Sequence, residues 1–297
     1  MLDFFLILLL LLKNSSEGSY MIVVSGKPSD FGTSETVSES WESCLASCGA
    51  DDECIATYKI SETQCQVFLF GSLTAIDKSY SGDIIGVKTE LSVDECPATN
   101  PLLLEPVYSF ENSDGQLYVT DLSIDDFQNY NLNYSILTCP ANTKLFQRTT
   151  VVVCIGLFMF ESPLCNNFAQ GSALCKSENG TLTGPANSIE YEYIQAQSNS
   201  SYNTSNPGGY SYLVYWIDGV GTNTKYVYTF EDPTHDGIEN YKFAGESPAY
   251  SGSNYCLCNP NPLGFYIADN LCSETYCCSS VCWRGALCQV PYATEVV

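Results

Sequence analysis

The chain has 297 residues, enough for two domains of ordinary size, and 45% hydrophobic residues, enough to form a buried core. It carries 34 acidic against 11 basic side chains, a formal net charge of −23. Nucleic acids, anionic membrane surfaces and heparin-like polymers are bound by clustered lysine and arginine, so this charge argues against all three as partners. The acidity itself serves solubility.

The N-terminal segment from Met1 to Leu12 is apolar but too short to span a bilayer, which needs about 20 such residues. It is typical of the hydrophobic region of a signal peptide, and the polar, small residues from Lys13 to Ser19 provide a cleavage zone. We therefore expect residues 1–18 to be a signal peptide and the protein to be secreted. Asp3 stands where a basic residue is usual, so a retained anchor is the alternative. No second apolar run of membrane length follows, and no membrane span is expected.

The cysteine content fits this location, because sixteen cysteines, an even number, would pair in an oxidising compartment. Seven of them fall between Cys256 and Cys288, without the paired spacing of a soft-metal site and apart from the only histidine, His235. We predict a disulfide framework there, holding an irregular loop around Asn-Pro-Asn-Pro, and no metal site. Glycosylation sequons occur at Asn14, Asn133, Asn179, Asn199 and Asn203.

Residues 20–96 are predicted to form a first small module. Tyr20–Ser25 is typical of a short strand that Gly26 and Pro28 break, and three further strand-like runs are ECIATYKI, QCQVFLF and IIGVKTE. Between them, the capping box from Thr36 to Glu39 predicts a helix that stops at Gly49. Cys44 and Cys48 share one face of this helix with Trp41 and Leu45, which should belong to the core.

The spacing C-x3-C-x5-C-x10-C, on a helix followed by strands and together with Trp41, resembles the PAN/apple family. It looks closest to the PAN-like module that nematode secreted proteins carry ahead of a lectin-like domain. The resemblance implies the bridges Cys44–Cys65 and Cys48–Cys54. It also implies a module that contacts protein or sugar, with a structural spacer as the alternative. Cys96 is left unassigned.

Residues 97–137 are expected to be a connector that begins extended, because of its prolines. Alternating apolar and polar residues around Asn112–Gly115 predict a hairpin, which belongs either to the first module or to a bridge between modules. Asp121, Asp125 and Asp126 lack the spacing of a calcium-binding loop and indicate a solvated loop instead.

A different pattern begins at Cys139, which closes a strand pair with Cys154. Ser162-Pro163 predicts the start of a helix that runs to Lys176 and faces inward through Leu164, Phe168 and Cys175. Asn187 or Ser188 caps a second helix, on which Ile189, Tyr193 and Ala196 have near-helical spacing. The runs YSYLVYWIDGV and TKYVYTF indicate strands, and their aromatic residues are expected in the core.

The order of these elements over residues 138–291 resembles the C-type lectin-like domain. The matching residues are Cys139-Pro140, Cys175, Trp216-Ile217-Asp218-Gly219, Cys258, Ile267-Ala268-Asp269, Cys272 and Cys288. The resemblance implies an α+β fold and the bridges Cys139–Cys154, Cys175–Cys288 and Cys258–Cys272, in the last of which Cys256 could replace Cys258. The pairing of the other cysteines stays open: Cys96, Cys165, Cys256, Cys277, Cys278 and Cys282.

Sugar-binding members of that family hold calcium with one triplet around a proline and a second triplet, Trp-Asn-Asp. The corresponding stretches are Glu246-Ser247-Pro248-Ala249 and Ile267-Ala268-Asp269 in this chain. Of the candidate ligand loop, Glu246, Pro248, Asp269 and Asn270, only three residues offer side-chain oxygens, whereas calcium takes about six to eight oxygen ligands. We therefore expect no cofactor, with a true calcium-dependent lectin using Glu246, Asp269 and Asn270 as the alternative.

The sequence as a whole predicts a secreted, lectin-like binding protein whose partner is a glycan, an extracellular protein or a microbial surface. The family resemblance adds an innate-immune role as an expectation. An enzyme is not expected, because one histidine leaves little for nucleophilic catalysis and nothing marks a pair of catalytic carboxylates.

Overall fold

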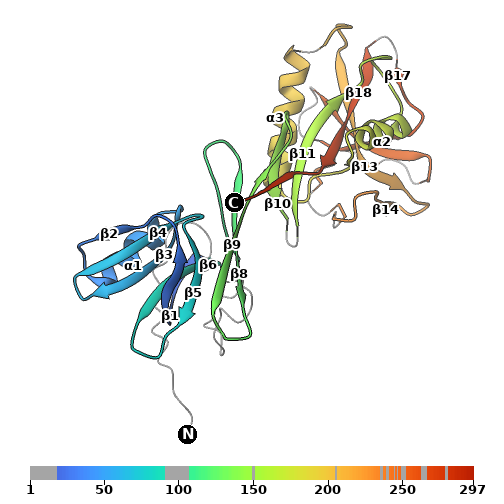
Figure 1. Cartoon of the computed structure of the whole chain (residues 1–297). Helices are drawn as coiled ribbons and strands as arrows, with labels where there is room; N and C mark the ends of the chain where they lie inside the picture. The colour runs from blue at the N-terminus through green and yellow to red at the C-terminus, as the bar shows by residue number, and fades with distance from the viewer. Residues whose placement is uncertain are drawn as a thin grey trace. The chain divides into compact units, whose positions relative to one another are not determined.

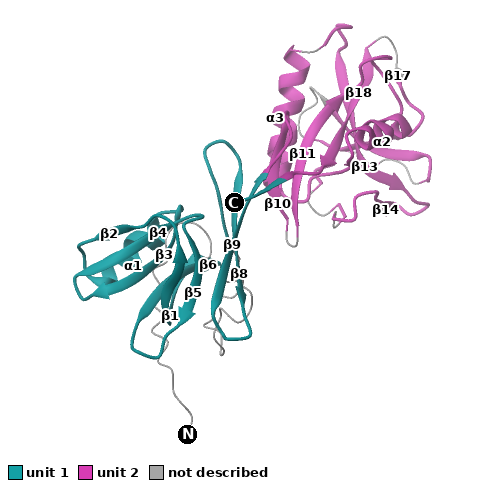
Figure 2. Ribbon diagram, in the orientation of Figure 1, with its two compact units in different colours: residues 1–137, 294–297 teal, residues 138–293 magenta. Residues whose placement is uncertain are grey.

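The computed structural model describes residues 19–297 except 91–106, 149–150, 205, 235–236, 239–240, 244, 246, 249–251, 262–265 and 278–279. The predicted signal peptide, Cys96, Glu246, His235 and Cys278 therefore lie outside the described residues, as does the side chain of Cys277. The chain divides into two compact units, unit 1 with residues 1–137 and 294–297, and unit 2 with residues 138–293 (Figure 2). No helix among the described residues is long and apolar enough to cross a membrane.

Unit 1 is a sheet with one helix packed on it (Figure 1). Its strands follow the order β2-β4-β3-β6-β1-β5-β9-β8-β7, with β19 paired to β9. The elements are β1 (Ser19–Phe31), β2 (Glu35–Val37), α1 (Trp41–Ala50), β3 (Cys54–Ser61), β4 (Gln64–Leu69), β5 (Leu73–Lys78), β6 (Ile84–Glu90), β7 (Val107–Glu111), β8 (Leu117–Ile124), β9 (Tyr130–Thr138) and β19 (Ala293–Val296).

Helix α1 buries the face that the sequence indicated, including Trp41 and Leu45. Disulfides join it to β4 through Cys44–Cys65 and to β3 through Cys48–Cys54, the pairs that the family resemblance implied. The predicted capping box was wrong, because Thr36 lies in β2. The side chain of Ser40 caps the helix instead, accepting a hydrogen bond from the Ser43 amide at 3.3 Å. The helix also continues through Gly49 to Ala50.

The strands of unit 1 are longer and more numerous than predicted. Strand β1 does not end at Gly26 but continues through Pro28, where the register with β5 shifts and the proline needs no ladder hydrogen bond. Strand β5 itself was not predicted. The hairpin around Asn112–Gly115 forms between β7 and β8, with the Asn112 side-chain oxygen accepting from the amides of Asp114 and Gln116.

Unit 2 is a mixed sheet with two helices (Figure 1). The sheet order is β10-β11-β18-β13-β15-β16, with β12 and β17 on β18 and β14 on β13. The elements are β10 (Thr143–Gln147), β11 (Val152–Met159), α2 (Phe168–Ser177), β12 (Thr181–Leu182), α3 (Ser188–Thr204), β13 (Tyr212–Gly221), β14 (Tyr228–Thr229), β15 (Tyr255–Asn261), β16 (Ala268–Leu271), β17 (Tyr276–Cys277) and β18 (Val281–Val290). Trp216 of β13 is fully buried in the core.

Of the two helices of unit 2, one begins where the sequence predicted and the other does not. Ser162-Pro163 does not start α2; the cap is Asn167, whose side-chain oxygen accepts from the Gln170 amide at 3.0 Å. Asn187 caps α3 as expected, accepting from the Glu190 amide at 2.9 Å. Ile189, which has near-helical spacing with Tyr193 and Ala196, is 66% exposed, because the helix turns Glu190 inward to an arginine and buries Tyr191 beside it.

The disulfides of unit 2 include Cys139–Cys154 and Cys175–Cys288, as the resemblance implied, and the additional bridge Cys165–Cys282. The pair Cys258–Cys272 was wrong, because Cys272 bonds to Cys256 and leaves a buried free thiol on Cys258. Cysteines 256 and 258 project from the same face of β15. The register of β15 against β16 decides which of the two cysteines bonds to Cys272. Cys256 lies opposite Asn270, which is two residues before Cys272, whereas Cys258 lies opposite Ala268.

The segment around Asn-Pro-Asn-Pro was also wrongly predicted as irregular loop. Residues 255–261 form β15, which lies between β13 and β16. Strand β16 extends only as far as the pair Cys258–Ala268, so Pro260 pairs with Val214 of β13 and has no β16 residue on its other side. A proline is tolerated at such a strand edge.

Candidate functional site

The candidate ligand region is the long loop, residues 222–254, which leaves β13 and returns at β15. Its first fixed point is Asp218 of β13, a fully buried side chain. The carboxylate accepts hydrogen bonds from the amides of Glu231 at 3.0 Å and Asp232 at 2.8 Å. Burial raises the pKa of Asp218 to about 6. One carboxylate therefore holds the loop where the chain turns back after β14.

A buried ion cluster supplies the second fixed point. Arg148, which follows β10, donates from Nε to Glu190 Oε1 at 3.0 Å and from Nη2 to Glu190 Oε2 at 2.9 Å. Its Nη1 donates to Asp232 Oδ2 at 2.9 Å, so one side chain ties α3 to the long loop. Burial favours protonated Asp232, but hydrogen bonds from Thr183 and Thr234 and the charge of Arg148 outweigh it, and the pKa of Asp232 is lowered.

Sequence reasoning missed this cluster, and nothing local marks it. Arg148 is separated from Glu190 by 42 residues and from Asp232 by 84. The side chain of Arg148 is 4% exposed and both acidic side chains are fully buried. Buried charges of this kind persist only when paired and hydrogen-bonded.

Asp269 and Asn270, the two candidate calcium ligands that the structure describes with side-chain oxygens, are not directed to one point. Asp269 and Asn270 are neighbours in β16, and successive strand residues project from opposite faces. The Asn270 amide donates to the Cys258 sulfur at 3.2 Å. Asp269 is 5% exposed, and burial together with the charge of Asp269 raises the pKa of Tyr228 well above its ordinary range.

The other two members of the predicted ligand loop add little. Pro248 is buried and follows a cis peptide bond, whereas Glu246 lies outside the described residues. Within the described parts of the chain, no three His, Cys, Asp or Glu side chains gather as a metal site would require.

The long-loop aromatics, which we define as Tyr226 and Phe243 of the long loop together with Tyr266, which precedes β16, are more prominent. Tyr226 is 52% exposed and Tyr266 47%. The Tyr226 ring packs edge-on to Phe243 with centroids 5.9 Å apart, and Phe243 forms a β-bridge with Ile267, the residue after Tyr266. The Lys225 ammonium lies 5.1 Å from the centre of the Tyr226 ring.

Tyr226 also corrects the sequence reasoning. The run TKYVYTF was predicted as a strand with core aromatics, but only Tyr228–Thr229 form β14. Tyr226 has a φ of 65°, in the left-handed region that bulky residues rarely adopt. Such backbone strain costs about 1–3 kcal/mol and concentrates at functional sites. The loop thus holds a tyrosine outward at an energetic cost.

The sequon asparagines described by the structure are accessible. Asn133 lies on β9, Asn179 follows α2, and the remaining two are Asn199 and Asn203 on α3. All four side chains are exposed. A glycan attached at any of them would meet no packed core.

Comparisons with known proteins cover each unit separately. Residues 21–89 match the family model of the PAN-like domain. A structure of a calcium-independent type II antifreeze protein is similar at 15% identity, covering 53% of this chain and 97% of that one, with a TM-score of 0.38. Human lithostathine is 13% identical, with coverages of 52% and 91% and a TM-score of 0.38. The carbohydrate-recognition domain of mouse scavenger receptor C-type lectin is 14% identical, with coverages of 52% and 98% and a TM-score of 0.35. No curated protein matches the chain.

The chain is a mixed α and β protein with disulfides, and its residues 21–89 match the PAN-like domain. For unit 2, the order of elements and the bridges Cys139–Cys154 and Cys175–Cys288 are those that the resemblance implied.

Proposed function

We propose that the protein is a secreted binding protein that recognises a glycan, a protein or a microbial surface through the long loop of unit 2, without the family's calcium-dependent sugar site. The observation that carries the proposal is the exposure of Tyr226 and Tyr266, whereas the candidate calcium ligand Asp269 is buried. Half-exposed tyrosines offer a rigid apolar face and a hydroxyl, the combination found at binding hot spots.

The supporting structure keeps the loop that carries Tyr226 in place before any ligand arrives. Asp218 and the Arg148 cluster hold the loop by hydrogen bonds that are shielded from solvent. A site fixed in this way loses little conformational entropy on binding. The retained loop without the full calcium triplets is therefore a binding surface in its own right.

A glycan array and a panel of microbial surfaces, each probed with the full secreted chain in calcium and in chelator, test this proposal. We expect binding that the chelator leaves unchanged and that Tyr226→Ala weakens at least about tenfold. The matched control is Tyr292→Ala, because Tyr292 is 39% exposed but lies outside the long loop. Equal binding by wild type and Tyr226→Ala would contradict the proposal.

The alternative is a true calcium-dependent lectin, which Asp269 favours because its carboxylate keeps the position of the second triplet. That reading requires Glu246, Asp269 and Asn270 to share one ion. Sugar binding that chelator abolishes and that Asp269→Asn also abolishes would support it.

The proposal extends to the maturation of the chain. We infer that residues 1–18 are removed as a signal peptide and that a lectin-like domain spans 138–291. The first module, 20–96, is extended by the predicted connector, 97–137, because strands β7, β8 and β9 belong to the same sheet. Glycans would be carried by the four exposed sequons, and the innate-immune role would follow from recognition of microbes. N-terminal sequencing of protein secreted from animal cells tests the removal of residues 1–18. Glycosidase treatment of the same protein tests the glycosylation of the sequons.

A further inference from the structure

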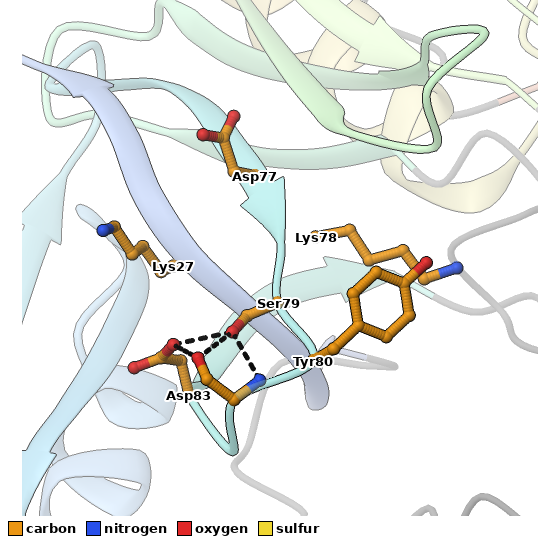
Figure 3. A pocket seen from close by; sticks show the side chains of 7 residues that line it. Lys27, Asp77, Lys78, Ser79, Tyr80 and Asp83 are labelled. Carbon is orange, nitrogen blue, oxygen red and sulfur yellow. Dashed lines mark hydrogen bonds between the residues drawn. The ribbon is translucent and has the colours of Figure 1, made fainter.

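A surface pocket of about 530 Å³ belongs wholly to unit 1. It is lined by Lys27 of β1 and by six residues between Asp77 and Asp83, where β5 leads into β6. Figure 3 shows Ser79 next to Asp83, with Lys27 on the left, Asp77 above them and both Lys78 and Tyr80 on the right. Neither the predicted ligand loop nor the long-loop aromatics contribute to it.

The base of this pocket is organised without a ligand. Asp83 accepts hydrogen bonds from the hydroxyls of Ser79 at 2.6 Å, Ser81 at 2.5 Å and Tyr58 at 2.9 Å. These three bonds, in that order of importance, lower the pKa of Asp83 to about 2. Ser79 Oγ also accepts from the Ser81 amide at 3.2 Å, whereas Ser81 donates its single hydroxyl proton to Asp83 and keeps an oxygen lone pair as an acceptor toward the pocket.

The two available cations of unit 1 converge on the same pocket. Among the four lysines that the structure describes in this unit, Lys59 pairs with Glu62 at 2.6 Å and Lys88 is 3% exposed. The other two, Lys27 and Lys78, both line the pocket. The pocket therefore has two ammonium donors, on these two lysines, and two carboxylate acceptors, on Asp77 and Asp83.

The charges of the lining therefore balance. Lys27 and Lys78 offset Asp77 and Asp83, and Lys27 lies directly opposite Asp77 in the pairing of β1 with β5. The lining thus carries no net formal charge in a chain of −23. A strongly charged ligand gains nothing from such a lining, whereas a neutral ligand with many hydroxyls finds both donors and acceptors.

Tyr80 provides the apolar part of the site. Its side chain is 84% exposed, and the Lys78 ammonium lies 5.6 Å from the ring centre while also donating to Gln128 Oε1. Lys78 is thus held against the tyrosine by a second contact. A single exposed aromatic is unremarkable by itself. Its position on the rim of a polar, charge-balanced pocket gives it a flat face for a sugar ring.

We propose that this pocket is a second binding site, which takes one neutral monosaccharide unit. The sugar's C–H face stacks on Tyr80, its hydroxyls donate to Asp77 and the Ser81 oxygen, and Lys27 donates to a sugar oxygen. No calcium takes part. The site is independent of the long loop and does not rest on the function proposed for unit 2.

Saturation-transfer NMR on the full chain tests the site, with the methyl glycosides of glucose, galactose, mannose and N-acetylglucosamine as separate probes. We expect ring-proton transfer to at least one of them, unchanged by chelator. Tyr80→Phe keeps the stacking face and retains the signal. Tyr80→Ala weakens affinity at least about tenfold. The control is Phe127→Ala, because Phe127 is 82% exposed in the same unit but does not line the pocket.

Several outcomes would overturn the proposal. Tyr80→Ala is compared in a Tyr226→Ala background, so that sugar bound at the long loop does not contribute to the signal. Transfer to none of the four glycosides, or transfer that survives Tyr80→Ala in that background, removes the site, and so does binding restricted to sulfated or acidic sugars or to peptides. Both alanine variants change exposed side chains, so unchanged thermal unfolding verifies their folding. Tyr226→Ala leaves this signal intact, which separates a failure here from a failure of the function proposed for the long loop.

Discussion

The buried ion cluster of unit 2 makes the most demanding prediction about stability. Arg148→Met removes the only cation that faces Glu190 and Asp232 among their described contacts and keeps most of the side chain's volume. Both carboxylates are fully buried. Removing one partner of a buried pair typically costs about 3–5 kcal/mol, because the charge left behind is uncompensated. For a unit of this size, that loss lowers the melting temperature by roughly 10 °C.

The assay is urea-dependent hydrogen exchange read on peptides from β13 and β18, which report on unit 2 alone. Lys176→Met is the matched control, since Lys176 pairs with Glu231 at 3.3 Å but is 64% exposed. It should cost less than about 1 kcal/mol. Adding Glu190→Gln to Arg148→Met should cost less than the sum of the single changes, because the stranded charge is gone. A loss for Arg148→Met no greater than that of the control would refute the reasoning.

Three further predictions concern single groups of unit 2. The pKa of Asp218 is raised to about 6 in the folded state, so the folded state binds this proton more tightly than the unfolded chain does. The free energy of unfolding of wild type, relative to that of Asp218→Asn, should therefore rise as the pH falls. Calorimetry should show a rise of about 1.4 kcal/mol between pH 7 and pH 5. Burial raises the pKa of the Cys258 thiol to about 12, so iodoacetamide should label it only after denaturation, and peptide mapping should recover Cys256 bonded to Cys272; labelling of Cys256 instead would reverse the assignment. A Cβ on Gly285 would lie 2.0 Å from the Phe158 carbonyl oxygen, so Gly285→Ala should destabilise unit 2 by at least about 2 kcal/mol in urea unfolding, whereas Gly245→Ala, with open space around it, should not.

The disulfide framework shows which parts of this fold can be predicted from sequence. Cysteines that stand alone on their element, such as Cys139 and Cys175, have the partners that the family resemblance implied. The choice between Cys256 and Cys258 could not be made, because two residues two apart in a strand share a face and only the register of β16 against β15 separates them.

The predicted helix starts and the predicted core position of Tyr226 were wrong for a different reason. The residues from Thr36 to Glu39 fit the pattern of a capping box, but Thr36 pairs with Gln66 of β4 and therefore lies in strand β2. Ile189 lies outside and Glu190 inside because a distant arginine turns the helix. Tyr226 looked like a core aromatic because alternation alone cannot tell a strand from a strained turn. Each error came from a contact between residues far apart in the sequence, which local pattern does not contain.

The central claim is that the long loop binds its partner without calcium. Isothermal titration of calcium chloride into the full secreted chain tests it most directly. The account predicts no uptake tighter than about 1 mM, and the same weak heats for wild type and Asp269→Asn. Tight, stoichiometric uptake by wild type that Asp269→Asn abolishes would contradict it.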